Sequence, residues 1–485
     1  MNRQFEDLYL TPKEVFRVEL LSALKAAQQQ SGEGLNLKAL AESLQLSYST
    51  VYHTYTLLLK DVATMTGENT VSVEALLATP EAELSWYFVQ DSVAYQLLGH
   101  LLADDLNNFD DFLRLTAYSR VTVLRRLQQL RRLARSLRVR IVYETMEMIG
   151  SELAIRIFLT VAFGEATQGL VWPFATISHQ QAAFIVAQMY ENTKLDFHNP
   201  VVKESHIYLA AVTFMRTNCG DWQTQMPETM STPVSNFFNF DHRLTKIAQI
   251  SESQAMFLIN VLTAVYTGTD DPQIMVMLVN QTHFDPAIRG FVKSVIQQLP
   301  PELVGGTAEA NRLHGLFEVS LTASVISVLT FGYDVSTTLA DQLNHHLKGT
   351  KADETLASII RLACQFAARD GQTPKSIDRN FSAITNALYT QILQLRQYLS
   401  PKSVKVGLIL GPVTMQYVDL LTFLARQPAV QIVDAHHEPC DLLIVTSALP
   451  VLAIDATSAV VIHWQSTHAQ TLLTRLFQLI QELQH

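Results

Sequence analysis

Cysteine is scarce in this chain of 485 residues, which holds only three. Cys219, Cys364 and Cys440 lie far apart and share no metal-ligand or redox spacing, so neither a metal site nor a thiol redox centre is indicated. This usage fits a reducing compartment, and we expect all three thiols to be packing residues. We expect no metal and no other cofactor.

Long apolar runs and excess positive charge are lacking as well. No run of about eighteen uncharged apolar residues indicates a membrane span, and residues 1–7 do not follow the basic-then-apolar order of a secretory signal. The formal net charge of -10 opposes indiscriminate coating of nucleic acid, because phosphate repels an acidic protein. We therefore expect a cytoplasmic protein of several domains, without membrane association, whose basic surface is local.

A sequence pattern occurs twice, with an offset of 72 residues. Residues 47–55 match residues 119–127 in their hydroxyl and apolar positions. The match extends upstream, where Leu37, Leu40, Ala41, Leu44 and Leu46 correspond to Phe109, Phe112, Leu113, Thr116 and Tyr118. The pattern predicts two helix-turn-helix units, in each of which a short helix packs on a second helix whose N-terminal side chains are free for the DNA major groove.

The first unit is predicted to hold three helices. Residues 11–14 are typical of a capping box with proline at the first helical position, and they open a helix that ends near residue 30. The third helix is expected to bury Val51, Tyr55 and Leu58. The predicted DNA contacts of this unit are Ser47, Ser49, Thr50, Tyr52 and His53. Because these side chains are polar or aromatic rather than cationic, we expect the first unit to bind weakly by itself.

The second unit is more basic. One helix is expected to bury an apolar stripe made of Val123, Leu127, Leu130, Ala134 and Leu137. Its stretch of chain carries eight arginines, which are Arg120, Arg125, Arg126, Arg131, Arg132, Arg135, Arg138 and Arg140. Strand-like runs at 139–143 and 146–149 then complete the outline of a winged helix.

The predicted DNA contacts of the second unit are Ser119, Arg120, Thr122, Arg125, Arg126, Arg131 and Arg132. If about six arginines contact phosphates, the logarithm of the affinity should fall with the logarithm of the salt concentration at a slope of about -5. The alternative is that the arginines only solvate a surface helix, which is the usual role of a charge run. The repeat and the wing favour DNA.

From about residue 172 to residue 400 the pattern is helical, and two blocks are alike. In each block a helix precedes a second helix that carries a histidine, and these histidines, His206 and His314, are 108 residues apart. We predict tandem helical bundles of similar size. A lone helical histidine is usually a packing or surface residue, and this interpretation stays open for both. Support is weaker for His179, His198, His283, His345 and His346.

After about residue 402 strands and helices alternate. Apolar runs at 404–410, 430–433, 442–446 and 459–462 predict the strands of a small parallel sheet. The apolar face of the last helix is expected to cover this sheet, and part of it to be available to another subunit. Gly407, Gly411 and Pro412 do not complete a phosphate-binding loop, because the dinucleotide fingerprint and the Walker lysine are missing.

Taken in order, these parts resemble the Mga/AtxA class of bacterial transcription regulators. That class combines two helix-turn-helix units, two phosphotransferase-system regulation domains and a module similar to enzyme IIB. Residues 149–152, with Ile155, Arg156 and Phe158, also resemble the segment that joins the winged helix to the regulation domains. The resemblance implies that His206 and His314 are phosphorylated, that a phosphocarrier protein is a transient partner, and that phosphorylation changes how the bundles dock.

The C-terminal module departs from catalytic enzyme IIB. The loop after its first strand, residues 410–414, lacks the phosphoacceptor cysteine, and Cys440 lies before a later strand instead. Without that thiolate no covalent phosphoryl relay is expected, so we do not expect an enzyme. The module is expected to join two subunits, and a homodimer would present paired DNA-binding units to separated half-sites.

The expected fold is multidomain and mainly α, with N-terminal helix-turn-helix and winged-helix units, two helical bundles, and a C-terminal α/β module with a small parallel sheet. The expected domain boundaries are 1–65, 85–165, 172–284, 285–398 and 402–485. The expected function is sequence-specific binding of double-stranded DNA and activation of transcription under the control of histidine phosphorylation. Three alternatives stay open: an RNA-binding antiterminator with the same regulation domains, a phosphotransferase-system component, and a structural adaptor.

Overall fold

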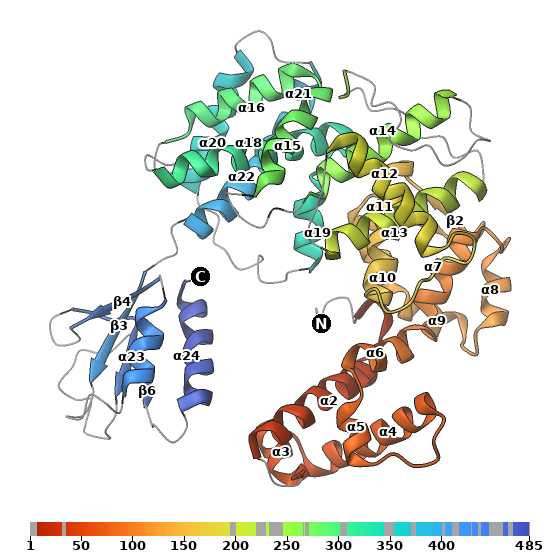
Figure 1. Cartoon of the computed structure of the whole chain (residues 1–485), viewed down its shortest axis with the longest axis vertical. Coiled ribbons are helices and arrows are strands. Elements are labelled where there is room, and N and C mark those ends of the chain that lie inside the picture. The colour runs from red at the N-terminus through yellow and green to blue at the C-terminus, as the bar shows by residue number, and fades with distance from the viewer. Residues whose placement is uncertain are drawn as a thin grey trace. The chain divides into compact units, whose positions relative to one another are not determined.

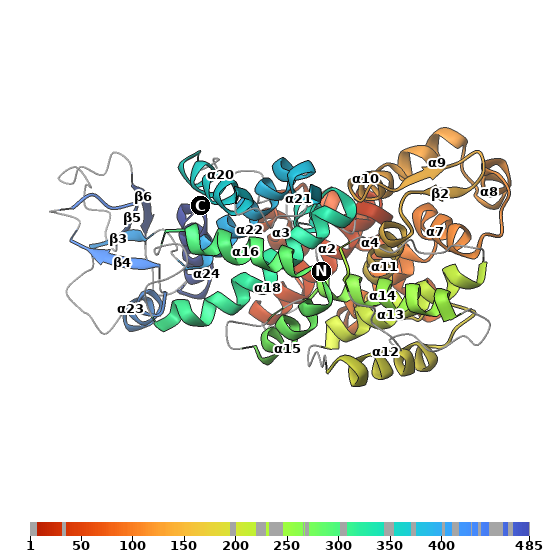
Figure 2. The ribbon, with the colours of Figure 1, turned by 90° about the horizontal axis from the view of Figure 1, so that it is seen from above.

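The computed structural model describes residues 7–31, 35–194, 200–219, 229–231, 246–264, 266, 271–300, 308–343, 354–369, 375–399, 403–409, 417–427, 429–434, 438–445, 459–463 and 469–484. Contacts divide the chain into two compact units, one made of Met1–Lys348 and Ala357–Leu388 and the other of Gly349–Leu356 and Tyr389–His485. The first unit is almost entirely helical, and the second holds a parallel sheet (Figures 1 and 2). The predicted fold class is confirmed, and the five domain boundaries stay predictions.

The N-terminal region contains both predicted helix-turn-helix units. The first consists of α2 (Pro12–Ser31), α3 (Leu37–Ser43) and α4 (Tyr48–Thr66), and α5 (Val73–Ala78) follows it. The second consists of α6 (Glu81–Val89), α7 (Val93–Ala103), α8 (Phe109–Leu115), α9 (Arg120–Arg126), α10 (Gln128–Ser136), β1 (Arg140–Val142) and β2 (Glu147–Ile149). The helices α3 and α8 begin and end 72 residues apart, and so do the starts of α4 and α9, so the sequence repeat is also a structural repeat.

Burial agrees with the predicted cores except at one residue. The stripe of the second unit is confirmed, since Val123, Leu127, Leu130, Ala134 and Leu137 are at most 1% exposed. In α4 Val51 and Leu58 are buried, but the prediction for Tyr55 is wrong, because that ring is only half-buried and Thr54 is buried instead. Thr54 can occupy this place because its hydroxyl donates to the Thr50 carbonyl, which satisfies the polar atom within the helix.

The predicted arginine-rich helix is two helices rather than one. Leu127 stands between α9 and α10 with φ -83° and ψ 0°, outside the geometry of a regular α-helix. Its amide still bonds the Val123 carbonyl, and its carbonyl accepts from the Arg131 amide. The axis is therefore perturbed at one residue while the apolar stripe continues across it. The wing follows, as an antiparallel hairpin in which Ile141 pairs with Met148.

The middle of the chain is helical, as predicted. Its elements are α11 (Glu152–Thr167), α12 (His179–Thr193), α13 (Pro200–Cys219), α14 (Lys246–Leu262), α15 (Pro272–Asn280), the 3-10 helix η1 (Gln281–His283), α16 (Pro286–Gln298), α18 (Ala308–Phe331), α19 (Val335–Leu343), α20 (Glu354–Arg369), α21 (Lys375–Arg379) and α22 (Phe381–Leu399). The helix α12 packs on α13 and α16 packs on α18, and α13 and α18 begin 108 residues apart. The similarity of the two blocks is thus visible in their helices.

Among the described residues, one helix is long and apolar enough to cross a membrane. It is the part of α18 from His314 to Phe331, and 61% of it is buried inside the protein. Both α15 and α16 pack against α18. Its apolar character is therefore explained by its place in the helical core.

A buried ion-pair network joins α11 to the first bundle. The Arg156 guanidinium is fully buried; its Nε donates to Glu152 of the same helix at 3.0 Å, and its terminal nitrogens pair with Glu252 of α14. Arg216 of α13 donates to the other side of Glu152, with its Nη2 2.7 Å from Oε2. Because a buried charge is tolerated only when it is paired, these four side chains fix α11, α13 and α14 to one another.

The second compact unit, which includes residues 389–485, contains the predicted parallel sheet. Its strands are β3 (Val404–Ile409), β4 (Val430–Val433), β5 (Leu442–Val445) and β6 (Val460–His463), in the order β4-β3-β5-β6. The helices α23 (Val418–Ala425) and α24 (Ala469–Gln484) join Val404, Val406, Leu442 and Ile444 in one apolar core. The expected cover of the sheet by the last helix is confirmed, since Leu476 and Ile480 of α24 are 1% exposed.

Candidate nucleic-acid interface

The two recognition helices begin in the same way. Ser47 and Ser119 are the N-caps of α4 and α9, and their hydroxyl oxygens accept from the amides of Thr50 and Thr122. In both units the serine and threonine hydroxyls also bond each other, at 2.7 Å in the first and 3.0 Å in the second. Four predicted contact residues, two in each unit, therefore cap the N-terminus of a recognition helix. The caps hold the neighbouring side chains at the exposed first turn of each helix.

The predicted contact residues of the first unit lie on its surface. Ser47, Ser49, Thr50, Tyr52 and His53 are all exposed. The Tyr52 ring stacks on Tyr48, with 5.8 Å between ring centroids, and each tyrosine is about half exposed. Tyr48 was not among the predicted contacts, although its place one turn before Tyr52 was a signal for it. The first unit thus offers hydroxyls and stacked rings rather than cations.

In the second unit the arginines fall into two groups, and the first is exposed. Arg125, Arg132, Arg135 and Arg140 belong to it. Arg132 makes one contact that is easily replaced, since its Nη1 donates to the Gln129 side chain at 3.2 Å. Guanidinium groups with this exposure are suited to phosphate oxygens or to guanine edges.

The other arginines make contacts within the protein. Arg120 pairs with Asp110 at 3.2 Å and lies over the Phe109 ring, yet its side chain remains 54% exposed. Arg126 lies over Tyr118, 4.1 Å from the ring centroid, and Arg131 lies over Tyr143 at 5.6 Å. Each of these guanidinium groups already lies against an aromatic ring of the protein. We therefore expect them to contribute less to DNA binding than the exposed arginines.

Arg138 serves a different purpose from the one its sequence context indicated. The sequence placed it only among the eight arginines of the second helix-turn-helix unit. Its Nη1 instead donates to the Phe331 carbonyl at 3.0 Å and its Nη2 to the Gly332 carbonyl at 3.1 Å. The Tyr333 hydroxyl returns a bond to the Leu137 carbonyl at 2.9 Å. Arg138 therefore links the winged helix to the turn between α18 and α19, and no sequence pattern reveals a contact 193 residues away.

Sequence reasoning also missed Val121, the second residue of α9. Val121 is 77% exposed, although valine usually lies inside. With Arg125, Gln128 and Arg132 it forms an exposed stripe, because these positions recur every three or four residues. An apolar side chain beside guanidinium groups at the start of a recognition helix is suited to the methyl group of thymine.

The two predicted phosphorylation sites differ in their surroundings. His206 in α13 is 2% exposed, its Nδ1 lies 2.7 Å from the Tyr190 hydroxyl, and burial lowers its pKa to about 3. His314, at the corresponding place in α18, is exposed. His198, His345 and His346 lie outside the described residues, as do the loop at 410–414 and with it Gly411 and Pro412. Cys364 and Cys440 are buried, as expected, and the Cys219 side chain lies outside the described residues.

One comparison with known proteins identifies the second unit. Residues 81–163 match the family model described as the Mga helix-turn-helix domain. The match begins with α6 and ends within α11, so it contains the whole winged helix. No curated protein matches the chain. The match supports a DNA-binding transcription regulator of the Mga type.

Proposed function

We propose that this protein is a cytoplasmic activator of transcription that binds specific double-stranded DNA sites through α9, with α4 as an auxiliary contact. The observation that carries the proposal is the repeated helix-turn-helix, whose second copy matches the Mga domain and exposes Val121, Arg125 and Arg132 on one face. Among the residues described at 7–167, helices predominate and only one short hairpin occurs. This mainly helical structure favours a DNA-binding protein over the RNA-binding alternative, which would begin with a β-rich module.

Genome-wide immunoprecipitation tests the DNA proposal. We expect an Arg125→Ala/Arg132→Ala variant to lose the enriched sites of the wild type, because it removes two exposed cations from the recognition face. The matched control is Arg361→Ala/Arg379→Ala, which removes the same charge from exposed positions on α20 and α21. Equal loss in both variants, or no loss in either, would contradict the proposed interface.

We also propose that phosphorylation of His206 and His314 by the sugar phosphotransferase system controls this activity. Their matching positions in α13 and α18 support paired regulation domains, and the exposure of His314 gives a phosphocarrier direct access. A phosphoryl group on His206 would require α12 and α13 to separate at Tyr190, so its addition would change bundle packing.

Phosphoryl transfer from a phosphorylated phosphocarrier protein tests this control. We expect His314 to be labelled first and His206 more slowly, and Tyr190→Phe to speed labelling of His206 by removing one hydrogen bond. Loss of all label in the His206→Ala/His314→Ala variant is required. Label that persists in that variant would move the regulated site elsewhere.

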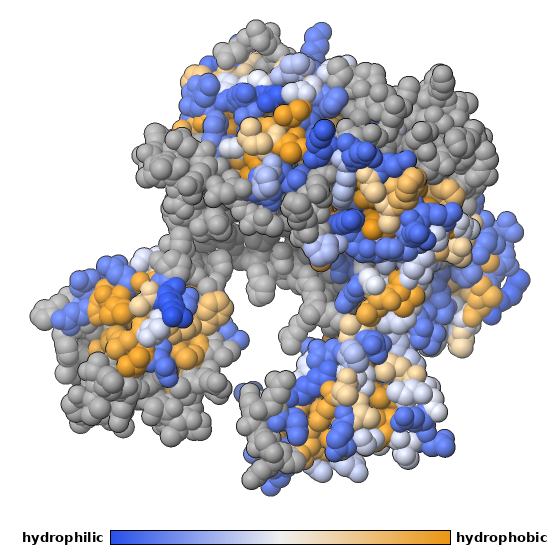
Figure 3. Space-filling view, in the orientation of Figure 1, coloured by the Kyte–Doolittle hydropathy of each residue, from blue (hydrophilic) through white to orange (hydrophobic). Residues whose placement is uncertain are grey.

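Finally, we propose that the C-terminal module joins two copies of the chain rather than carrying phosphoryl groups. Apolar side chains on α23 and α24 support this role, since Val418 is 46% and Phe477 45% exposed. Figure 3 shows apolar surface over these two helices, interrupted by polar residues. An exposed apolar patch of this kind favours association over solvation.

A further inference from the structure

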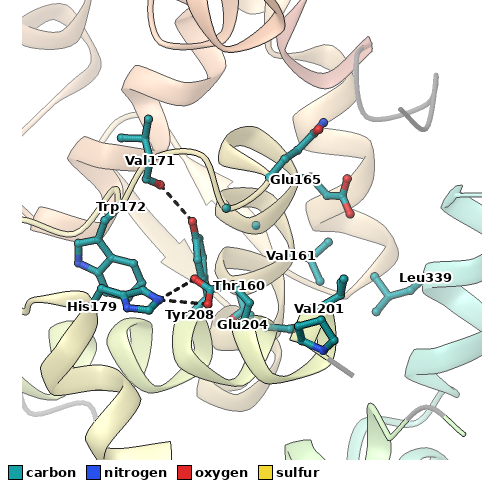
Figure 4. Close-up of a pocket in the computed structure, with 15 residues that line it drawn as sticks. Thr160, Val161, Glu165, Val171, Trp172, His179, Val201, Glu204, Tyr208 and Leu339 are labelled. Carbon is teal, nitrogen blue, oxygen red and sulfur yellow. Dashed lines mark hydrogen bonds and ion pairs between the residues drawn. The ribbon is translucent and has the colours of Figure 1, made fainter. Parts of the chain in front are cut away.

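A cavity of about 840 Å³ lies between α11, α12, α13 and α19 (Figure 4). One side of it is a single face of α11, where the adjacent pairs Thr160–Val161 and Gly164–Glu165 lie one helical turn apart. Trp172 lies on one side of the opening and Leu339 of α19 on the other. This volume falls in the range of about 300–1,000 Å³ that small-molecule sites occupy.

The side chains that form the aromatic wall of the cavity contact one another. The Trp172 ring lies 5.3 Å from the Tyr208 ring and 4.9 Å from His179, in both cases edge to face. His179 Nε2 lies 3.0 and 3.1 Å from the two carboxylate oxygens of Glu204, and the Tyr208 hydroxyl donates to the Val171 carbonyl (Figure 4). These polar groups satisfy one another, so the wall presents a preformed apolar and aromatic surface.

One polar group on α11 differs from that wall. The Glu165 carboxyl lines the cavity one turn after Val161, and burial raises its pKa to about 7. None of the described residues that line the cavity is lysine or arginine, so its carboxylates meet no fixed cation there.

We propose that this cavity binds a small organic cation with an apolar or aromatic body, its ammonium group at Glu165 and its body between Trp172, Val161 and Leu339. An ammonium group donates charge-assisted hydrogen bonds to a carboxylate, which is the acceptor that α11 presents to the cavity. The aromatic wall adds attraction for a cation and buries apolar surface. Because α19 also packs against α10, an occupant lies beside a helix that contacts the winged-helix unit.

Three probes with the same body and different charge test the class of ligand. They are 2-phenylethylamine, 2-phenylethanol and 3-phenylpropionate, titrated into the full chain and followed by calorimetry and saturation-transfer NMR. We expect the amine to bind at least about tenfold more tightly than the alcohol, which corresponds to one charge-assisted bond, and the carboxylate not to bind. Equal affinities for the amine and the alcohol, preference for the carboxylate, or no binding of any probe would overturn the proposal.

Variants locate the site. A Cβ at Gly164 would meet no atom within 4 Å, so Gly164→Ala should fold and bind the amine, whereas the larger side chain of Gly164→Leu should occupy the space beside Glu165 and abolish binding. Glu165→Gln should weaken the amine at least about tenfold and leave the alcohol unchanged, while Glu191→Gln, at an exposed carboxylate of α12, should leave both unchanged. Amine binding that survives Gly164→Leu in a variant with wild-type circular dichroism would exclude this cavity. These readouts do not involve DNA, so their failure is distinct from failure of the proposed function.

Discussion

At the scale of single residues, the structure separates arginines that are available to DNA from arginines that hold the protein together. Arg125 and Arg132 are exposed, whereas Arg138 is bound to two carbonyl oxygens. We predict that Arg125→Ala/Arg132→Ala makes the negative slope of log affinity against log salt shallower by about two, since each lost phosphate contact removes about 0.9 from its magnitude. Arg138→Ala should leave the slope unchanged. Fluorescence anisotropy between about 50 and 200 mM salt measures both, and equal slopes for the two variants would contradict the assignment.

The exposed Val121 leads to a prediction about base readout. If its methyl groups contact a thymine methyl, replacing that thymine by deoxyuracil in a selected site should weaken wild-type binding about fourfold, the value of one buried methyl group. The Val121→Ala variant should bind the thymine and uracil sites about equally. Binding to a set of sites with one thymine replaced at a time identifies the base. A wild type that tolerates every replacement would show that Val121 reads no methyl group.

Glu165 makes stability depend on pH in a defined window. Its pKa is raised from 4.5 to about 7 by burial, so between these values the folded state binds more protons than the unfolded state and stability falls as pH rises. Tyr9 faces this carboxyl, and His179, Glu204 and Tyr208 share its cavity. We predict that Glu165→Gln is more stable than the wild type at pH 8 by up to about 3 kcal/mol and about equal to it near pH 4.5.

Denaturant unfolding at several pH values measures this difference. Glu191→Gln is the control, because it removes a carboxyl group from an exposed position on α12. The prediction fails if the wild type and the Glu165→Gln variant show parallel dependence on pH between 4.5 and 7.

At the scale of elements, the turn between α18 and α19 leaves space for the Arg138 guanidinium group at Gly332. Gly332 has φ +76°, and a Cβ there would lie 2.6 Å from Arg138 Nη1. We predict that Gly332→Ala lowers the free energy of unfolding by about 1–2 kcal/mol through backbone strain, and further by displacing the guanidinium group. Gly169→Ala is the matched control, because Gly169 has φ +75° and open space at its Cβ position. Equal losses in the two variants would mean that the Arg138 contact adds nothing.

Elements with a local sequence signature were predictable, and contacts between distant elements were not. The strands β3 to β6 were recognised almost to the residue, because a buried parallel strand is a continuous apolar run bounded by polar residues. The helices α3, α4, α8 and α9 were recognised because their hydroxyl and apolar positions recur. The Arg138 contact spans 193 residues and the Arg156–Glu252 pair spans 96, and no periodicity encodes either. The break at Leu127 was also missed, since leucine is a good helix former.

The candidate site shows the same division between local and distant information. Exposure of Ser49, Tyr52 and Arg125 follows from helical phase and was predicted. Ser47 and Ser119 were predicted as DNA contacts, and the structure shows that they are also the N-caps of the two recognition helices. The cavity beside α11 was invisible in the sequence, because its lining combines Thr160, Trp172 and Leu339 from separate segments. The burial of His206 against Tyr190 likewise depends on how α12 packs on α13.

At the scale of the whole molecule, the proposed DNA-binding surface and the proposed association surface belong to different compact units. The recognition helices α4 and α9 belong to the first compact unit, and α23 and α24 belong to the second compact unit. If two copies join through the second compact unit, the dimer brings two winged helices to one DNA molecule. Its overall affinity for a paired site then exceeds that of one winged helix, without any new contact at the DNA. This arrangement would compensate for the small number of exposed cations in each copy.

The dimer is tested at Phe477, which is 45% exposed on α24. We predict that the wild type elutes with twice the chain mass of 54.4 kDa and that Phe477→Glu elutes as a monomer, because a charge in an apolar interface is not solvated. The control is Phe184→Glu, at a phenylalanine that is 63% exposed on α12. Light scattering after size exclusion gives the masses. In DNA titrations the Phe477→Glu variant should keep its affinity for a half-site and lose the added affinity of a paired site, whereas a monomeric wild type would remove the basis for both expectations.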